Sequence, residues 1–159
     1  MVWNRSIIPR HAFITWIYSH KRLPAKVRRS KYRHQDTVCS LCHSEGEDDQ
    51  HILFTCPYAQ EVWRGLKDWW NLPILQINHS FFESMINIKG PKAKKSMTYA
   101  IHTARIYYLW RARNMAVFQN KRTPSHQTIM AIKEQVRNRI LFLNQGMHKF
   151  QSYADNLLL

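Results

Sequence analysis

Three cysteines and one histidine stand at spacings that suit a single metal ion. Cys39 and Cys42 are separated by two residues, His51 follows eight residues later, and Cys56 comes after four more. Each short gap lets two donor atoms approach one ion, and Zn²⁺ takes four sulfur or nitrogen ligands in a tetrahedron. We therefore predict one bound Zn²⁺ ion, held by these four side chains.

Four protein ligands leave no coordination position for water, so the predicted ion is structural and not catalytic. Two alternatives stay open from the residues alone. The cysteines could be three unrelated buried thiols, because free cysteine is a common core residue. His43, beside Cys42, could replace His51 as the fourth ligand, but that loop would be strained. The five-residue stretch from Glu45 to Asp49 contains four acids, which we interpret as solvated side chains.

The net charge narrows the class of partner. The chain of 159 residues has 24 Lys and Arg against 10 Asp and Glu, a formal net charge of +14. So many positively charged side chains repel one another in the folded chain, which favours binding to a polyanionic partner. Nucleic acid is the usual one, and an acidic membrane surface is the rival. No apolar run reaches the ~18–20 residues that a membrane-spanning helix needs, so we expect no such helix. Of the two polyanions we predict nucleic acid as the partner, and no membrane.

The basic residues gather in two clusters, which we predict to contact nucleic acid without reading its sequence. The first, the 21–33 cluster, consists of Lys21, Arg22, Lys26, Arg28, Arg29, Lys31 and Arg33. The second, the 92–95 cluster, consists of Lys92, Lys94 and Lys95. For the first cluster, the alternative is an ordinary solvated face. A flexible linker is the alternative for the second.

Apolar spacing predicts a mainly helical chain. We expect a helix over about 9–20, with Phe13, Trp16 and Ile17 on one face and Trp16 in the core. A short basic helix follows Pro24, residues 37–50 form a loop, and another helix begins near Pro57 and ends before residue 73. The segment Ser80-Phe-Phe-Glu83 has the form of a capping box and predicts a further helix.

The C-terminal half is predicted to be an antiparallel helical hairpin. After the break at Gly90-Pro91, apolar residues keep helical spacing from Met97 to Met115. A second stripe follows Thr123-Pro124 and continues to Met147 in steps of three or four. We divide the chain into a zinc-binding region (1–72), a connecting segment with a short helix (73–96), the hairpin (97–150) and a C-terminal tail (151–159).

The N-terminal part is similar to a known family in the zinc ligands and the residues around them. The residues that carry the likeness are Val2, Trp3, Pro9, Phe13, Trp16, Leu23, Pro24, Cys39, Cys42, Glu47, His51, Phe54, Cys56, Pro57, Val62 and Trp63. Together they resemble the zinc-binding domain near the C-terminal end of the reverse-transcriptase polyprotein in plant LINE-type non-LTR retrotransposons. The run from Leu109 to Phe118 resembles the helix that often follows this domain. The resemblance implies the same four ligands and nucleic-acid binding, in a stand-alone or domesticated fragment.

These observations lead to two functional hypotheses. The first is a non-catalytic, zinc-dependent module that binds RNA or DNA. The second is a protein–protein interaction scaffold in which zinc serves folding alone and the C-terminal helices take a partner or a second copy. We expect no enzyme, since no arrangement of Ser, His and Asp or of Cys and His suggests a nucleophile. Unpaired cysteines favour a reducing compartment, the nucleus or cytoplasm. A basic N-terminus without acids before Asp36 makes the mitochondrion the alternative.

Overall fold

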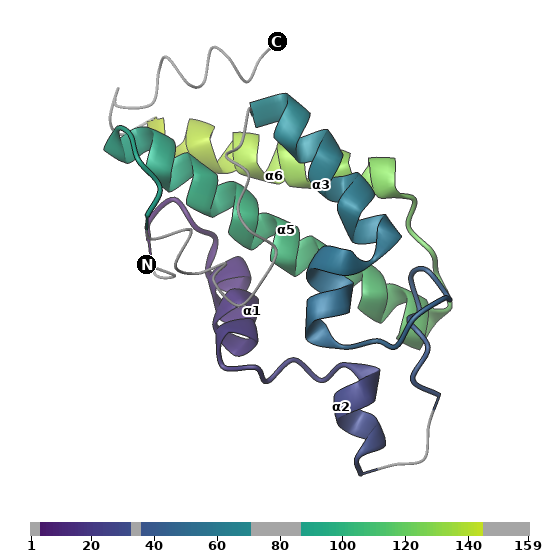
Figure 1. The fold of residues 1–159 in the computed structure, drawn as a ribbon. Helices are drawn as coiled ribbons and strands as arrows, with labels where there is room; N and C mark the ends of the chain where they lie inside the picture. The colour runs from purple at the N-terminus through teal and green to yellow at the C-terminus, as the bar shows by residue number, and fades with distance from the viewer. Residues whose placement is uncertain (1–3, 33–35, 71–86, 145–159) are drawn as a thin grey trace.

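The computed structural model describes residues 4–32, 36–70 and 87–144, and every structural statement below concerns these residues. The elements, in chain order, are α1 (Pro9–Ser19), α2 (Lys26–Ser30), the π-helical turn η1 (His51–Thr55), α3 (Pro57–Trp70), α5 (Lys92–Gln119) and α6 (Ser125–Asn144) (Figure 1). The described part contains no strand, only an isolated antiparallel bridge between Val38 and Gly46. The fold is mainly helical, as the sequence predicts.

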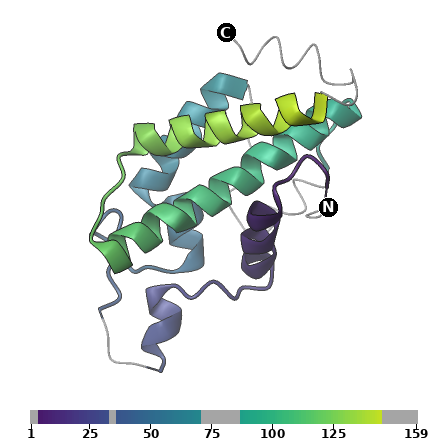
Figure 2. The same ribbon diagram turned by 180° about the vertical axis from the view of Figure 1, so that it is seen from behind.

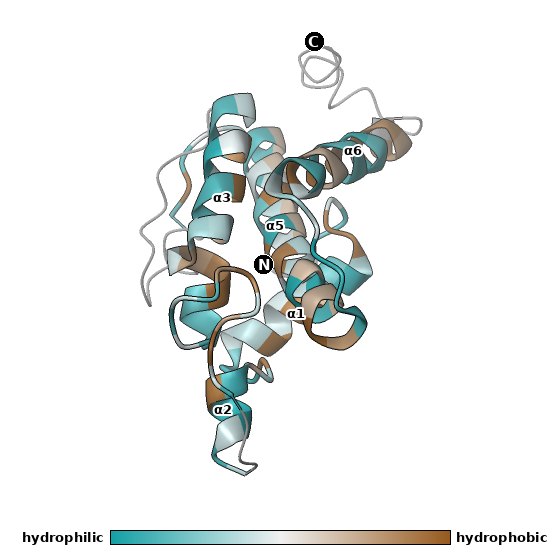
Figure 3. Cartoon of the chain, turned by 90° about the vertical axis from the view of Figure 1, so that its right-hand side faces the viewer, coloured by the Kyte–Doolittle hydropathy of each residue, from teal (hydrophilic) through white to brown (hydrophobic). Residues whose placement is uncertain are grey.

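Helix α5 is the central element. It contacts α1, α3, η1 and α6, and Figure 3 shows it lying between α3 and α1. Fifteen of its 28 residues are buried, more than one helix face can supply, because neighbours cover it on several sides. The core is one continuous cluster that reaches from Tyr18 to Ile140, so elements from both halves of the chain share it.

Helices α5 and α6 form the predicted antiparallel hairpin (Figure 2). Asn120 adopts a left-handed conformation with φ of 48° and ends α5, and α6 begins five residues later. The middle of the predicted stripe on α6, namely Ile132, Val136 and Ile140, is buried. The end of the stripe at Met147 lies outside the described residues, as does the predicted helix at Ser80.

Helix α3 begins at Pro57, where the missing N–H of proline costs no hydrogen bond. Its buried residues Ala59, Val62 and Leu66 recur at helical spacing on one face. A Cβ atom at Gly65 would lie 2.6 Å from Cδ1 of Ile129, so glycine permits the close approach of α3 to α6.

The orientation of α1 differs from the prediction. Phe13 and Trp16 are 51% and 38% exposed, whereas the buried residues are His11, Ala12, Thr15 and Tyr18. Small side chains on the buried face let α1 pack against α5, and the Thr15 hydroxyl donates to the His11 carbonyl at 2.8 Å. Thr15 can therefore be buried at no loss of hydrogen bonding. Placing Trp16 in the core was wrong.

Within the described residues, no helix is both long enough and apolar enough to cross a membrane.

Candidate metal centre

The four predicted ligands come together at one point between the loop 36–50 and the start of α3. One donor atom from each of Cys39, Cys42, His51 and Cys56 lies within 4.8 Å of the donor atoms of the other three. Cys39, His51 and Cys56 are buried and Cys42 is half-buried. Three sulfurs and one imidazole nitrogen at this separation form a tetrahedral donor set suited to Zn²⁺.

The first two ligands sit on a tight turn. Cys39 N–H donates to the carbonyl of Glu45 at 2.7 Å, and His43 N–H donates to the carbonyl of Cys39 at 2.9 Å. The turn reverses at His43, which has a left-handed φ of 59°. His43 is exposed and does not belong to the donor cluster. His51 is therefore the histidine that the fold places beside the three sulfurs.

His51 is oriented by contacts to its other ring nitrogen. Its Nε2 lies 3.3 Å from Sγ of Cys42, whereas its Nδ1 lies 3.1 Å from Oε2 of Glu45 and 3.2 Å from Oγ1 of Thr55. A carboxylate that accepts the Nδ1 proton leaves the Nε2 lone pair directed at the sulfurs. Asp48 also accepts the His51 backbone N–H at 2.6 Å, which holds η1 in place.

Cys56 occupies the position before α3 and faces the first N–H groups of that helix. The backbone N–H groups of Tyr58 and Ala59 donate to its sulfur. A helix N-terminus carries unpaired N–H groups and a partial positive charge, and both stabilise a thiolate. The start of α3 thus supplies hydrogen bonds to the fourth ligand.

The protonation of the thiols shows why this cluster suits a cation. A hydrogen bond from Cys56 lowers the pKa of Cys39 to about 5. The same contact, together with burial, raises the pKa of Cys56. Sulfurs this close cannot all ionise in the absence of a positive charge. A divalent ion would remove that conflict by stabilising three thiolates, so the donor set fits Zn²⁺.

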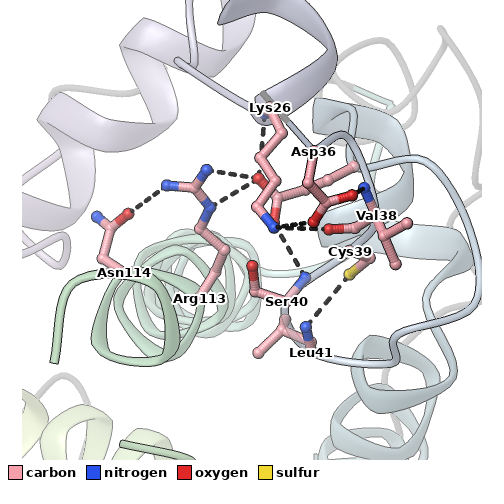
Figure 4. Close-up of polar contacts among 9 residues, drawn as sticks. Lys26, Asp36, Val38, Cys39, Ser40, Leu41, Arg113 and Asn114 are labelled. Carbon is pink, nitrogen blue, oxygen red and sulfur yellow. Dashed lines mark hydrogen bonds and ion pairs between the residues drawn. The ribbon is translucent and has the colours of Figure 1, made fainter. Parts of the chain in front are cut away.

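A buried ion pair joins the zinc loop to α5, and the sequence analysis missed it. Glu47 is 0% exposed, so its interpretation as a solvated acid was wrong. Its Oε1 accepts hydrogen bonds from Nε and Nη2 of Arg113, at 2.9 and 2.5 Å, and from the backbone N–H of Lys26 at 3.1 Å. Its Oε2 accepts the N–H of Ser40 at 3.2 Å. Figure 4 shows Arg113 on α5 approaching the turn that carries Ser40.

Glu47 therefore joins three segments that are far apart in sequence: the start of α2, the Cys39–Cys42 turn and α5. Two features of the sequence could have pointed to this contact. Glu47 lies between the ligand pairs Cys39/Cys42 and His51/Cys56, and Arg113 lies in the run from Leu109 to Phe118 that resembles the helix after the family's zinc-binding domain. Neither spacing nor composition indicates that these two residues would meet.

Several residues of the 21–33 cluster already have partners. Lys26 Nζ lies 3.2 Å from Oδ2 of Asp36 and donates to the Val38 carbonyl at 2.8 Å. Arg28 donates to the Lys21 carbonyl. The exposed residues of this cluster are Lys21, Arg22, Arg28 and Lys31, with Arg29 half-buried, and Arg33 lies outside the described residues.

The 92–95 cluster occupies the first turn of α5. Lys92 and Lys94 are exposed and Lys95 is half-buried. In Figures 1 and 2 this end of α5 and α2 lie at opposite ends of the molecule. The two predicted clusters therefore do not form one continuous surface.

Comparison with known protein families gives a match in the N-terminal part of the chain. Residues 1–63 match the family described as zinc-binding in reverse transcriptase. The matched segment contains all four donor residues and ends within α3. No curated protein and no solved structure matches the chain. The family match and the donor cluster together make this a zinc-binding module.

Proposed function

We propose that this protein is a non-catalytic, zinc-dependent module that binds nucleic acid, derived from the reverse-transcriptase polyprotein of a plant LINE-type retrotransposon. The zinc ion would hold the loop 36–56 and the start of α3 together. The bound partner would be RNA or DNA, recognised through its phosphates and without sequence preference.

The observation that carries this proposal is the imbalance of charge on the surface. The ion pairs of lysine or arginine with carboxylates in residues 4–32, 36–70 and 87–144 include Lys26 with Asp36 and Arg113 with Glu47. Apart from Arg105 and Arg113, no lysine or arginine in these ranges is buried. Exposed cations without carboxylate partners attract phosphate and release its counterions.

The non-catalytic role follows from the number of ligands. Three thiolates and one imidazole complete a tetrahedral shell, which leaves no position at the ion for water or substrate. The ion would therefore contribute folding free energy, because its ligands are assembled only in the folded chain.

The test is a binding titration of the zinc-loaded chain with single-stranded RNA, single-stranded DNA and duplex DNA at several salt concentrations. We expect the logarithm of the binding constant to fall linearly with the logarithm of salt concentration for at least one ligand. No binding of any ligand at about 50 mM salt, a concentration at which phosphate contacts are strong, would refute the proposal.

A charge variant tests the 21–33 cluster. Arg29→Gln with Lys31→Gln should lower affinity for a single strand and reduce the salt slope by about 1.4, since each phosphate contact contributes about 0.7. These positions spare Arg28, which holds the Lys21 carbonyl. The matched control is Arg64→Gln with Lys67→Gln on α3, outside both clusters, which should leave the slope unchanged. Equal effects of the two double variants would exclude the 21–33 cluster as a contact.

The scaffold hypothesis also has an observation in its favour. On α6, Met130, Leu141 and Phe142 are 63%, 38% and 65% exposed. Exposed apolar residues on one helix suit a protein partner or a second copy of the chain. Light scattering of the purified protein tests it: a dimer that Phe142→Asp converts to a monomer would favour the scaffold.

For the compartment, we propose the nucleus or cytoplasm, with the mitochondrion as the alternative. Three thiolates in a zinc site suit a reducing compartment. Imaging of the chain fused at its C-terminus to a fluorescent protein distinguishes these locations.

A further inference from the structure

A groove between α1 and the C-terminal half of α5 combines aromatic side chains with positive charge. It has a volume of about 390 Å³. Its lining includes Ile14 of α1 and Tyr107, Arg111, Asn114 and Phe118 of α5, and no lining residue is acidic. Tyr107, Arg111, Asn114 and Phe118 recur every three or four residues along α5, so they form one stripe on the groove side of the helix.

Phe118 presents the groove's exposed ring. Its side chain is 66% exposed one residue before α5 ends. Among the described residues its ring forms no contact with another ring or cation, whereas Tyr107 packs against His11 with ring centroids 4.6 Å apart. Phe118 therefore offers a free ring face for a ligand ring to stack on.

The charged groups around this ring are basic. Arg111, on the same stripe, is exposed, and its guanidinium carbon lies 5.8 Å from the ring centre of Tyr108. Lys121 follows the end of α5 and lines a second hollow, between α5 and α6, with a volume of about 200 Å³ that also reaches Arg111. A third hollow beside Arg111 contains Glu134 of α6, whereas neither the groove nor the hollow of Lys121 has an acidic lining residue.

Asn114 supplies a hydrogen-bond donor between the charge and the ring. Its Oδ1 accepts a hydrogen bond from Nη1 of Arg113 at 2.9 Å, which fixes the amide. Its Nδ2 group has no hydrogen bond among the described residues and remains available as a donor. Phe118 comes seven positions after Arg111, about 10 Å along the helix. This equals the length of about three stacked nucleotides at 3.4 Å each.

The start of α2, which carries part of the 21–33 cluster, also lies near the C-terminal half of α5. The Oε1 atom of Glu47 accepts hydrogen bonds from both Arg113 on α5 and the backbone N–H of Lys26 at the start of α2. This shared oxygen places the start of α2 beside the C-terminal half of α5.

We propose that the groove between α1 and α5 binds a single-stranded nucleic acid, with one base stacked on Phe118 and phosphates held by Arg111 and by Lys121 of the adjoining hollow. This inference rests on the proposed function and adds the strandedness of the ligand and its contact surface. A single strand is favoured over a duplex because only unpaired bases can offer a ring face to Phe118. An acidic polymer is favoured over an apolar peptide because the groove contains Arg111 and no acid.

The test measures fluorescence anisotropy of labelled 12-residue oligo(U) and oligo(dT) and of a 12-base-pair duplex with the zinc-loaded full chain. Phe118→Ala should weaken single-strand binding about 5- to 150-fold, the effect of losing one stacked base, with little change in the salt slope. Phe118→Trp should retain binding because it keeps a stacking face. The matched control is Phe142→Ala, since Phe142 is 65% exposed on α6, away from the groove.

The charge contribution is tested in the same assay. Arg111→Gln with Lys121→Gln should lower single-strand affinity and reduce the salt slope by about 1.4. The matched double control, Arg64→Gln with Lys67→Gln on α3, should leave both the affinity and the salt slope unchanged. Melting curves that superimpose on those of the parent protein establish that each variant is folded.

The failure of this inference is distinguishable from that of the proposed function. If the parent chain binds single strands but Phe118→Ala and Phe142→Ala behave alike, the groove is not the contact surface, although the module binds nucleic acid. If Phe118→Ala weakens duplex binding as much as single-strand binding, base stacking is overturned. If the parent chain binds no nucleic acid at all, both proposals fail.

Discussion

Replacing Glu47 with alanine removes an acceptor on which three segments converge. The carboxylate accepts four hydrogen bonds, two from Arg113 and one each from the backbone N–H groups of Lys26 and Ser40. Both partners of the ion pair are buried, at 0% and 1% exposure. The substitution therefore leaves a buried guanidinium without its counter-charge, which is costlier than losing a surface ion pair.

The expected loss of stability follows from that burial. Breaking a buried ion pair by removing one partner costs about 3–5 kcal/mol. For a chain of this length, this corresponds to a fall in Tm of about 6–20 °C. Because the N–H of Ser40 lies within the Cys39–Cys42 turn and also loses its acceptor, zinc affinity should fall with stability.

The assay combines thermal unfolding of the zinc-loaded protein with zinc competition against a chromophoric chelator. Glu61→Ala, an exposed acid on α3, is the control and should change stability by less than about 0.5 kcal/mol. The double variant Glu47→Leu with Arg113→Met removes both charges and should lose less stability than Glu47→Ala, because no unpaired charge remains buried. A Tm for Glu47→Ala within about 2 °C of the parent protein would refute this reasoning.

Three further predictions concern the zinc ligands and a buried histidine. Cys56→Ser should reduce bound zinc well below the one equivalent per chain expected by metal analysis and should unfold the loop 36–56, as circular dichroism can follow. Glu45→Gln should weaken zinc binding about 10-fold in the chelator assay, because the partner of His51 Nδ1 loses its charge, and Glu61→Gln should not. Burial, with a further contribution from Arg10, lowers the pKa of His11 to about 3. The unfolded chain binds a proton there below pH 6.5 while the folded chain does not, so stability falls as pH decreases through this value. Between pH 7 and pH 5, the free energy of unfolding measured in urea should fall by about 2 kcal/mol less for His11→Phe than for the parent protein. Equal falls for the two proteins would contradict this prediction.

Some features of the molecule are local and could be predicted from the sequence. Pro57 and Pro91 mark helix starts because proline restricts the backbone whatever surrounds it. The stripe through Ile132, Val136 and Ile140 predicts the buried face of α6 because it recurs at the helical period. The same reasoning failed for α1, which has apolar residues on several sides.

What the sequence by itself determined is the set of metal donors and the helical class of the chain, because ligand spacing and helical periodicity act over a few residues. Only the tertiary structure decided which face of α1 turns inward, that Glu47 meets Arg113, and that Phe118 stays exposed near the end of α5. Each of these depends on which neighbour covers a side chain. Glu47 and Arg113 are 66 residues apart, and their contact exists only because α5 passes beside the zinc loop.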